Sequence, residues 1–266
     1  LNEEKYNDDE DAWYYADGNG HLYAGEFKTI NGKKYAFRQD GRMIDGLQLI
    51  NVKGGFLVEG DDGKYNFETE DDFNENTATA LEDGYRYYYF GDGEDGAMKT
   101  NKTNITIDGD SFNFYFEKSG GNKGVGLTGE KDDKYYQSGK LITAGKDEKY
   151  QVVKRTDKST TATAASKYTY SKLDDVQAFL DSITSAKYNS GIDATNLSKL
   201  KDLGVNKKAE DLNELYIIDD SVSVNDYFLV NTSGKVIDTK SKNKEGNDYI
   251  YVVKKGGKIA AIYAEN

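Results

Sequence analysis

The chain contains no cysteine, no proline and a single histidine, His21, among its 266 residues. Without cysteine it has no disulfide, no thiolate zinc site and no cysteine nucleophile. A histidine-based metal cage or a serine–histidine–aspartate triad would depend wholly on His21. The chain also lacks a Gly-x-Ser-x-Gly elbow and a P-loop, which argues against common hydrolase and nucleotide-binding chemistry.

Long apolar runs and clusters of basic residues are also missing. No stretch approaches the roughly 20 apolar residues of a membrane span, and no basic-then-apolar signal segment begins the chain. The net charge is −12, and the acidic residues are spread along the whole sequence. This charge disfavours binding to nucleic acids and to anionic membrane surfaces, because both carry negative charge themselves.

Aromatic residues replace the scarce aliphatic ones. Only 36% of the chain is hydrophobic, yet it has 22 Tyr, 11 Phe and one Trp. A tyrosine buries its ring while its hydroxyl stays in water, which suits a thin structure in which most side chains lie near solvent. The aromatic content also argues against disorder, since disordered chains are poor in such residues.

One short phrase recurs along the chain: a Gly/Asp turn, one or two polar residues, then paired aromatics. The copies cover residues 31–37, 61–67, 82–90, 108–116, 131–136, 146–153 and 246–253. Self-similarity at this spacing indicates an array of small supersecondary units. The sequence therefore predicts a mainly β fold, built from tandem β-hairpins stacked as a solenoid-like array, with repeated surface grooves suited to binding.

The pattern divides the chain into five predicted segments. They are an acidic leader (1–11), a β-hairpin repeat region (12–153), a small polar linker or long loop (154–167), a helical segment (168–218) and C-terminal β-hairpins (219–266). In the repeat region Tyr85, Tyr87 and Tyr89 share one strand face while Tyr88 and Phe90 lie on the other. These strands are therefore expected to be contacted on both sides.

Helical periodicity is confined to residues 171–216. A first helix is predicted around residues 173–183, with Ser171 and Asp174 as its N-terminal signature. A second is predicted at 195–203 with Gly204 as its C-cap, and a third at 207–216. These helices either form a partner-binding bundle or pack locally on the last repeats, and the second interpretation is the simpler one.

Two hairpins carry a recognisable motif. The segment Trp13-Tyr-Tyr-Ala-Asp-Gly-Asn-Gly-His-Leu-Tyr-Ala-Gly25 and the segment Tyr35-Ala-Phe-Arg-Gln-Asp-Gly-Arg-Met-Ile-Asp-Gly46 follow one plan of aromatics, Gly turn and closing Gly. This plan resembles the cell-wall-binding repeats of Gram-positive surface proteins, the family of choline-binding and glucan-binding modules. Looser matches occur at residues 88–98, 135–145 and 227–236.

The resemblance implies a non-catalytic, secreted or surface-displayed module that attaches to a cell-wall polymer or glycan without a cofactor. Choline-binding members cage the ammonium with aromatics that include a Trp after the opening Gly. That slot here holds Glu26-Phe27, Leu47 and Lys146, which speaks against choline. The expected glycan or choline-like site is the N-terminal hairpin pair: Trp13, Tyr15, Phe27, Tyr35, Phe37 and Met43.

Several alternatives remain open from the residues. Any single ring can simply be hairpin core, and the repeats can form a structural spacer or adhesin scaffold that contacts a protein partner, including through the helical segment. The acidic turn at residues 17–26 resembles a calcium loop but lacks its ligand spacing, so a hairpin turn is favoured and no metal site is assigned. The acidic residues 70–72 are interpreted as a solvated loop. Glycoside hydrolysis would need two carboxyls facing each other across a cleft.

Overall fold

The computed structural model describes residues 12–53, 56–59, 69–91, 95–158 and 167–266. The repeat phrase at 61–67 and the acidic leader at 1–11 lie outside the described residues. The chain divides into two compact units, residues 1–127 with 138–140, and residues 128–137 with 141–266. Within the described residues no helix is both long enough and apolar enough to cross a membrane.

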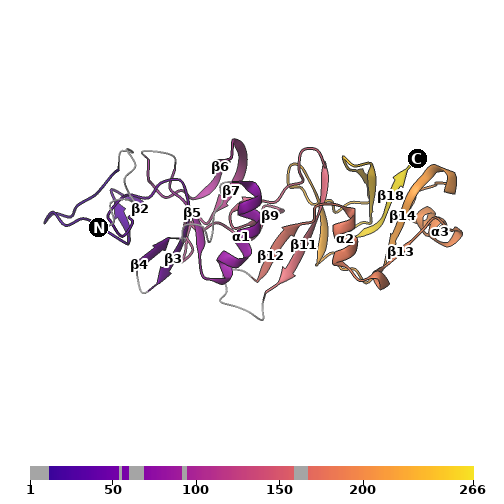
Figure 1. Ribbon diagram of the computed structural model, residues 1–266, viewed down its shortest axis with the longest axis horizontal. Helices are drawn as coiled ribbons and strands as arrows, with labels where there is room; N and C mark the ends of the chain where they lie inside the picture. Colours follow the sequence, from indigo (N-terminus) through magenta and orange to yellow (C-terminus); the bar gives the residue numbers. More distant parts are fainter. Residues whose placement is uncertain (1–11, 54–55, 60–68, 92–94, 159–166) are drawn as a thin grey trace. The chain divides into compact units, whose positions relative to one another are not determined.

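The first unit is built from antiparallel strands and one helix (Figure 1). In chain order these are β1 (Phe27–Ile30), β2 (Lys33–Ala36), β3 (Leu47–Lys53), β4 (Phe56–Glu59), α1 (Glu70–Glu82), β5 (Arg86–Tyr89), β6 (Asn101–Ile107) and β7 (Asp110–Phe116). Strands β1 and β2 form a ribbon, β3 lies between β4 and β5, and β6 pairs with β7. The predicted mainly β class is confirmed.

Tight turns explain why these strands pair. Asn31 and Gly32 have φ values of 49° and 81°, and Asp108 and Gly109 have φ values of 48° and 81°. Two successive residues with positive φ make the turn whose twist matches that of the flanking strands, and Asn, Asp and Gly adopt it most readily. The Asn-Gly and Asp-Gly pairs in the recurring phrase therefore set the register of β1–β2 and β6–β7.

Helix α1 corrects the interpretation of residues 70–72 as a solvated loop. Thr69 caps the helix: its hydroxyl accepts a hydrogen bond from the backbone N–H of Asp72, whose carboxylate accepts one from the backbone N–H of Thr69. This reciprocal cap satisfies two of the N–H groups that a helix start leaves unpaired. Residues 82–90 are accordingly the end of α1 followed by β5, and not a hairpin.

The core of the first unit is largely aromatic. Phe73 of α1 packs on Tyr87 of β5 and Phe114 of β7, with ring centroids 4.7 and 5.7 Å apart. On the opposite face of β5, Tyr88 and Phe90 belong to a second cluster. The prediction that this strand is contacted on both sides is confirmed, because rings of alternate residues enter different clusters.

The second unit holds a larger sheet. Its elements in chain order are β8 (Gly129–Lys131), β9 (Lys134–Gln137), β11 (Tyr150–Asp157), β12 (Tyr168–Lys172), α2 (Val176–Ser182), β13 (Tyr188–Ser190), α3 (Ala194–Asp202), β14 (Leu212–Ile218), β15 (Tyr227–Asn231), β16 (Ser241–Lys244), β17 (Tyr249–Val253) and β18 (Ile259–Glu265). Five strands run in the order β13-β14-β18-β17-β16, and β11 lies between β12 and β15. The short strand β10 (Lys140–Leu141) spans the boundary between the units.

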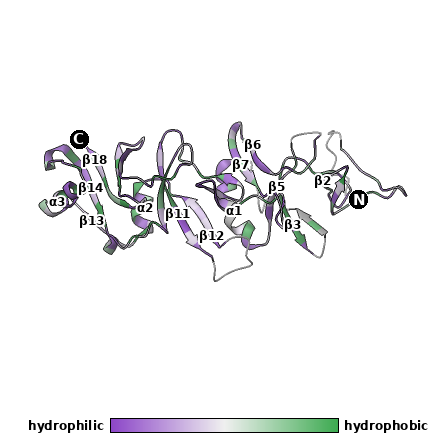
Figure 2. Ribbon diagram, turned by 180° about the vertical axis from the view of Figure 1, so that it is seen from behind, coloured by the Kyte–Doolittle hydropathy of each residue, from purple (hydrophilic) through white to green (hydrophobic). Residues whose placement is uncertain are grey.

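The five-stranded sheet is covered by a helix on each face. Phe179 of α2 packs in a cluster with Tyr251 and Ile262, whereas Leu200 of α3 packs in another with Tyr263 and Ile217. Tyr251 and Ile262 face the opposite side of the sheet from their neighbours in sequence. Figure 2 shows hydrophobic residues concentrated in strands such as β14. The apolar faces of both helices are thus occupied by local packing.

The helical predictions have mixed outcomes. The predicted helix at 195–203 is confirmed as α3, with Gly204 directly after its last residues at a φ of 88°. The first helix begins later than predicted, because Asp175 and not Ser171 is its N-cap. The third is wrong: residues 209–211 make a short 3₁₀ turn, and Leu212–Ile218 is strand β14. Residues 154–157 of the predicted linker continue strand β11.

A seven-residue loop recurs in both units. It covers residues 16–22, 37–43, 230–236 and 253–259, and in each copy the first and last residues pair antiparallel. The fifth residue is always glycine, with φ values of 81°, 88°, 75° and 89° for Gly20, Gly41, Gly234 and Gly257. Its N–H donates to the carbonyl of the second residue in all four copies. Glycine adopts such positive φ values at no steric cost, because it has no Cβ.

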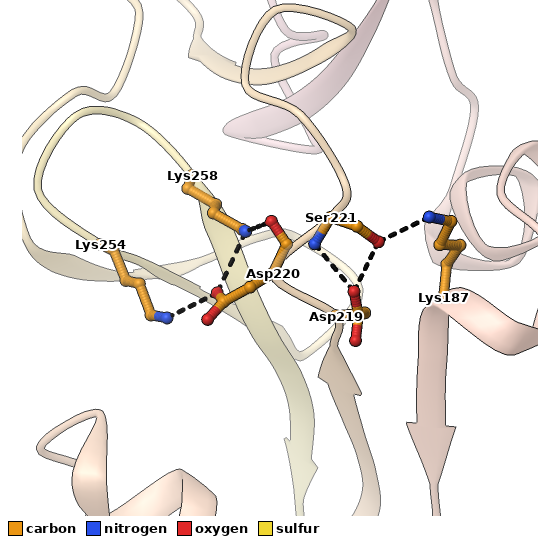
Figure 3. A network of polar contacts seen from close by, with 6 residues as sticks. All are labelled: Lys187, Asp219, Asp220, Ser221, Lys254 and Lys258. Carbon is orange, nitrogen blue, oxygen red and sulfur yellow. Dashed lines mark hydrogen bonds and ion pairs between the residues drawn. The ribbon is translucent and has the colours of Figure 1, made fainter.

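Charged contacts hold the last of these loops (Figure 3). Lys254 and Lys258 both approach the carboxylate of Asp220, at 2.8 and 3.0 Å. Next to it, Ser221 donates to Asp219 and accepts a hydrogen bond from Lys187 at 2.6 Å. The two lysines hold the pKa of Asp220 at about 2, below its ordinary value. The loop 253–259 is thereby tied to the segment that follows β14.

Candidate functional site

The N-terminal hairpin places several apolar side chains at the surface. Trp13, Tyr14 and Tyr15 are 53%, 46% and 44% exposed, and Leu22 is 53% exposed. They are the main exposed large hydrophobic residues among those described, in a chain whose other rings are mostly covered. Exposed apolar side chains that gather in one place commonly mark a binding surface.

One of these exposed rings, Tyr15, is connected to two rings further inward. Tyr15 stacks on Tyr23 with ring centroids 5.8 Å apart and planes within 10°, and Tyr23 contacts Phe37 at 6.1 Å. Phe37 is only 1% exposed, so it forms the floor. We call Trp13, Tyr14, Tyr15, Tyr23 and Phe37 the aromatic row.

The hairpin backbone fixes where the row lies. The N–H of Tyr23 donates to the carbonyl of Tyr15, which brings the two rings opposite each other across the turn. The N–H of Met43 donates to the carbonyl of Trp13 at 2.8 Å and so joins the first hairpin to the second. Tyr14 and Leu22 cover Gly41, where a Cβ would lie 3.5 and 3.6 Å from their side chains.

The side chains of the other three predicted site residues make different contacts. Phe27 packs on Tyr88 and Phe90, with centroids 5.3 and 6.3 Å apart, as part of the core. Met43 lies against Gly96, where any Cβ would overlap its side chain. Tyr35 is half-buried on the β1–β2 ribbon. The structure therefore connects Tyr15 to Phe37 through Tyr23 and joins Trp13 to Met43 through the backbone. The side chains of Phe27 and Met43 make other contacts.

Sequence reasoning missed Tyr14, Leu22 and Tyr23. Ala16 and Leu22 pair at the ends of the seven-residue loop, so Tyr15 and Tyr23, one residue outside each end, are direct neighbours. The position of Gly20 within the loop was the sequence signal for this pairing. The second hairpin has the same arrangement, because the N–H of Ile44 donates to the carbonyl of Ala36. Aligning the two loops on Gly20 and Gly41 would have identified Tyr23.

The acidic turn beside the row is structural. One carboxylate oxygen of Asp17 accepts hydrogen bonds from the backbone N–H groups of Asn19 and His21, at 2.8 and 2.9 Å. These bonds, the His21 one first, hold the pKa of Asp17 below its usual value. The interpretation as a hairpin turn is confirmed. Among the described residues no cluster of three acidic or histidine side chains could hold a metal ion.

A second aromatic cluster occurs in the second unit. Tyr135 contacts Phe228 and Tyr170, with centroids 4.6 and 5.2 Å apart. Tyr170 and Phe228 are 7% and 3% exposed, and burial raises the pKa of Tyr170 to about 12. Tyr135 and Phe228 lie in the looser motif matches at 135–145 and 227–236, and Tyr170 lies on β12. Its burial makes it a core element rather than a surface.

The comparisons with known proteins return choline-binding proteins among the solved structures. An endolysin from phage Cp-1, solved with choline, is 15% identical over 49% of this chain and 30% of its own, with a TM-score of 0.25. Choline binding protein F from Streptococcus pneumoniae is 23% identical over 50% and 39%, with a TM-score of 0.18. CbpJ from Streptococcus pneumoniae TIGR4 is 14% identical over 91% and 82%, with a TM-score of 0.31.

The chain spans well under half the length of the first two of these structures. No family model matches the chain, and neither does any curated protein. The similarity to choline-binding proteins agrees with the resemblance drawn from the hairpin motif.

Proposed function

We propose that this chain is a non-catalytic module of a secreted or surface-displayed protein, which attaches to a cell-wall polymer or surface glycan. The observation that carries the proposal is the exposed end of the aromatic row, Trp13, Tyr14 and Tyr15. Rings exposed to this extent cost free energy in water, and a sugar ring presents C–H groups that stack on a π face. The wall or cell surface is the expected location.

The hairpins are proposed to follow one another as a solenoid-like array. Within the first unit the closing glycines support this. The N–H of Gly25 donates to the carbonyl of Arg38 in the second hairpin, and Gly46 exchanges backbone hydrogen bonds with residues 90–91. A polymeric glycan offers the same ring many times over. Weak contacts along such a polymer add through effective concentration, so a shallow surface suffices for firm attachment.

The decisive experiment is retention of the full chain on purified, insoluble Gram-positive cell walls. A Trp13→Ala/Tyr15→Ala double variant removes two exposed rings, each contributing about 1 kcal/mol, so retention should fall by about tenfold or more. Val52→Ala is the matched control, because Val52 is 50% exposed but lies away from the row on β3. Soluble wall glycan should compete with the wall for the wild-type chain.

A structural spacer or adhesin scaffold is the alternative, and a separate observation favours it. Tyr87, Phe114 and Phe116 are at most 1% exposed, so the aromatics of the central strands only build the core. Absence of retention on every wall and glycan preparation would support the spacer. Release of soluble sugar from walls incubated with the chain would instead show that it is an enzyme.

A further inference from the structure

A lysine of the chain lies on the aromatic row. The Nζ atom of Lys28 is 4.2 Å from the centroid of the Tyr23 ring. Lys28 belongs to β1, where it pairs with Tyr35 of β2, so the two side chains share one face of the ribbon. A cation at this distance from a ring is attracted by the negative charge of the π face. The ammonium group of Lys28 therefore occupies the cation position of Tyr23.

The same arrangement recurs at other rings. The Nζ of Lys34 lies 4.4 Å from the centroid of Phe27, on the same ribbon. In the second unit Arg155 and Lys167 lie 4.6 and 5.0 Å from the centroid of Tyr168. The chain thus provides its own cations to several aromatic surfaces, and the contact at Tyr23 is the one beside the exposed rings.

We propose that Lys28 determines the specificity of the aromatic row: it fills the cation position, so the row accepts an uncharged saccharide and rejects quaternary ammonium ligands. The inference rests on the proposed function, because it names the class of ligand taken by the same surface. The lysine N–H groups also suit a saccharide, since they can donate to its hydroxyl oxygens.

The magnitude follows from electrostatics. A second cation placed against Tyr23 would lie within about 5 Å of the Lys28 ammonium, and at the surface of a protein two such charges repel strongly enough to weaken binding by about tenfold or more. A neutral sugar experiences no such repulsion. Replacing Lys28 by methionine keeps most of the stem and removes the charge, so the ring face becomes accessible to an external cation.

The test uses the fluorescence of Trp13, the only tryptophan of the chain and itself part of the row. The full chain is titrated with choline chloride and, separately, with a soluble oligosaccharide of N-acetylglucosamine, against sodium chloride at equal ionic strength. Lys28→Met should gain affinity for choline by about tenfold. Lys28→Arg keeps the charge and should behave as wild type. Lys33→Met is the control, as an exposed lysine on the neighbouring strand.

Each outcome decides the inference. A choline response in Lys28→Met that is absent in wild type, Lys28→Arg and Lys33→Met supports it. Choline affinity that is equal in wild type and Lys28→Met overturns it, whether or not the oligosaccharide binds. If Lys28→Met gains choline but no variant binds the oligosaccharide or cell walls, Lys28 excludes cations as inferred while the proposed glycan function fails.

Discussion

Replacement of Glu245 by glutamine should stabilise the second unit at alkaline pH. Glu245 follows β16 and is only 4% exposed, and its carboxylate hydrogen-bonds with the hydroxyl of Tyr251. Burial above all, together with the negative charges of Asp175 and Glu148, raises the pKa of Glu245 to about 7, although the hydrogen bond from Tyr251 lowers it. The folded chain therefore holds a proton on this carboxyl that the unfolded chain releases at lower pH.

The sign and size follow from this difference. The pKa in the unfolded chain is 4.5, so between 4.5 and about 7 the folded state binds more protons and its stability falls as the pH rises. At about pH 8 the shift corresponds to a loss of about 3 kcal/mol relative to a pH below 4.5. Glutamine cannot ionise, so Glu245→Gln should recover most of that free energy at about pH 8 and change little at about pH 4.

Hydrogen exchange of the β17 and β18 amides measures the free energy of opening in this unit directly. It should be recorded at about pH 5, 6.5 and 8 for wild type, Glu245→Gln and the control Asp202→Asn, which changes an exposed carboxylate at the end of α3. Equal pH dependence in wild type and Glu245→Gln would refute the reasoning, because the buried carboxyl would then not be the group that titrates.

Two further substitutions test the scaffold. Gly96→Ala should lower the free energy of unfolding by about 1–3 kcal/mol, because Gly96 has a φ of 56° and a Cβ would overlap the side chain of Met43. Urea unfolding measures this loss. A Gly96→Ala/Met43→Ala double variant that shows no relief of the clash would contradict the explanation. Asp193→Ala should lower the free energy of unfolding by about 1 kcal/mol, because Asp193 is the N-cap of α3 and its carboxylate accepts a hydrogen bond from the N–H of Asn196 at 2.8 Å. An unchanged midpoint of thermal unfolding would exclude that role.

Local signals in the sequence predicted the hairpins but not every helix. The Asn31-Gly32 and Asp108-Gly109 turns specify their conformation within two residues, so their ribbons could be predicted. Helix α1 was missed because it has few apolar residues on one face. The capping pair Thr69 and Asp72 was the one local signal that indicated a helix there.

The opposite error occurred at β14. Leu212, Leu215 and Tyr216 have helical spacing, but the strand is buried on both faces and so shows no alternation of polar and apolar residues. Only the covering by α2 and α3 determines its conformation, and that covering is not local.

The candidate site was predictable in part. The motif placed Trp13, Tyr15 and Phe37 in one hairpin pair, and in the structure Tyr15 is connected to Phe37 through Tyr23, with Trp13 exposed two residues before Tyr15. Side-chain contacts decided the rest: Phe27 packs on Tyr88, a residue far away in sequence. The position of the Lys28 ammonium over Tyr23 likewise depends on a strand register that a sequence pattern does not give.

The seven-residue loops make little demand on the residues at their tips. Closure requires a glycine at the fifth place and a pair of strand residues at the ends, whereas the intervening positions are as different as Gly18-Asn19 and Thr232-Ser233. The side chains at the tip of one loop can therefore change without changing its backbone. A binding residue can be gained at one tip, or lost from another, while the fold stays the same.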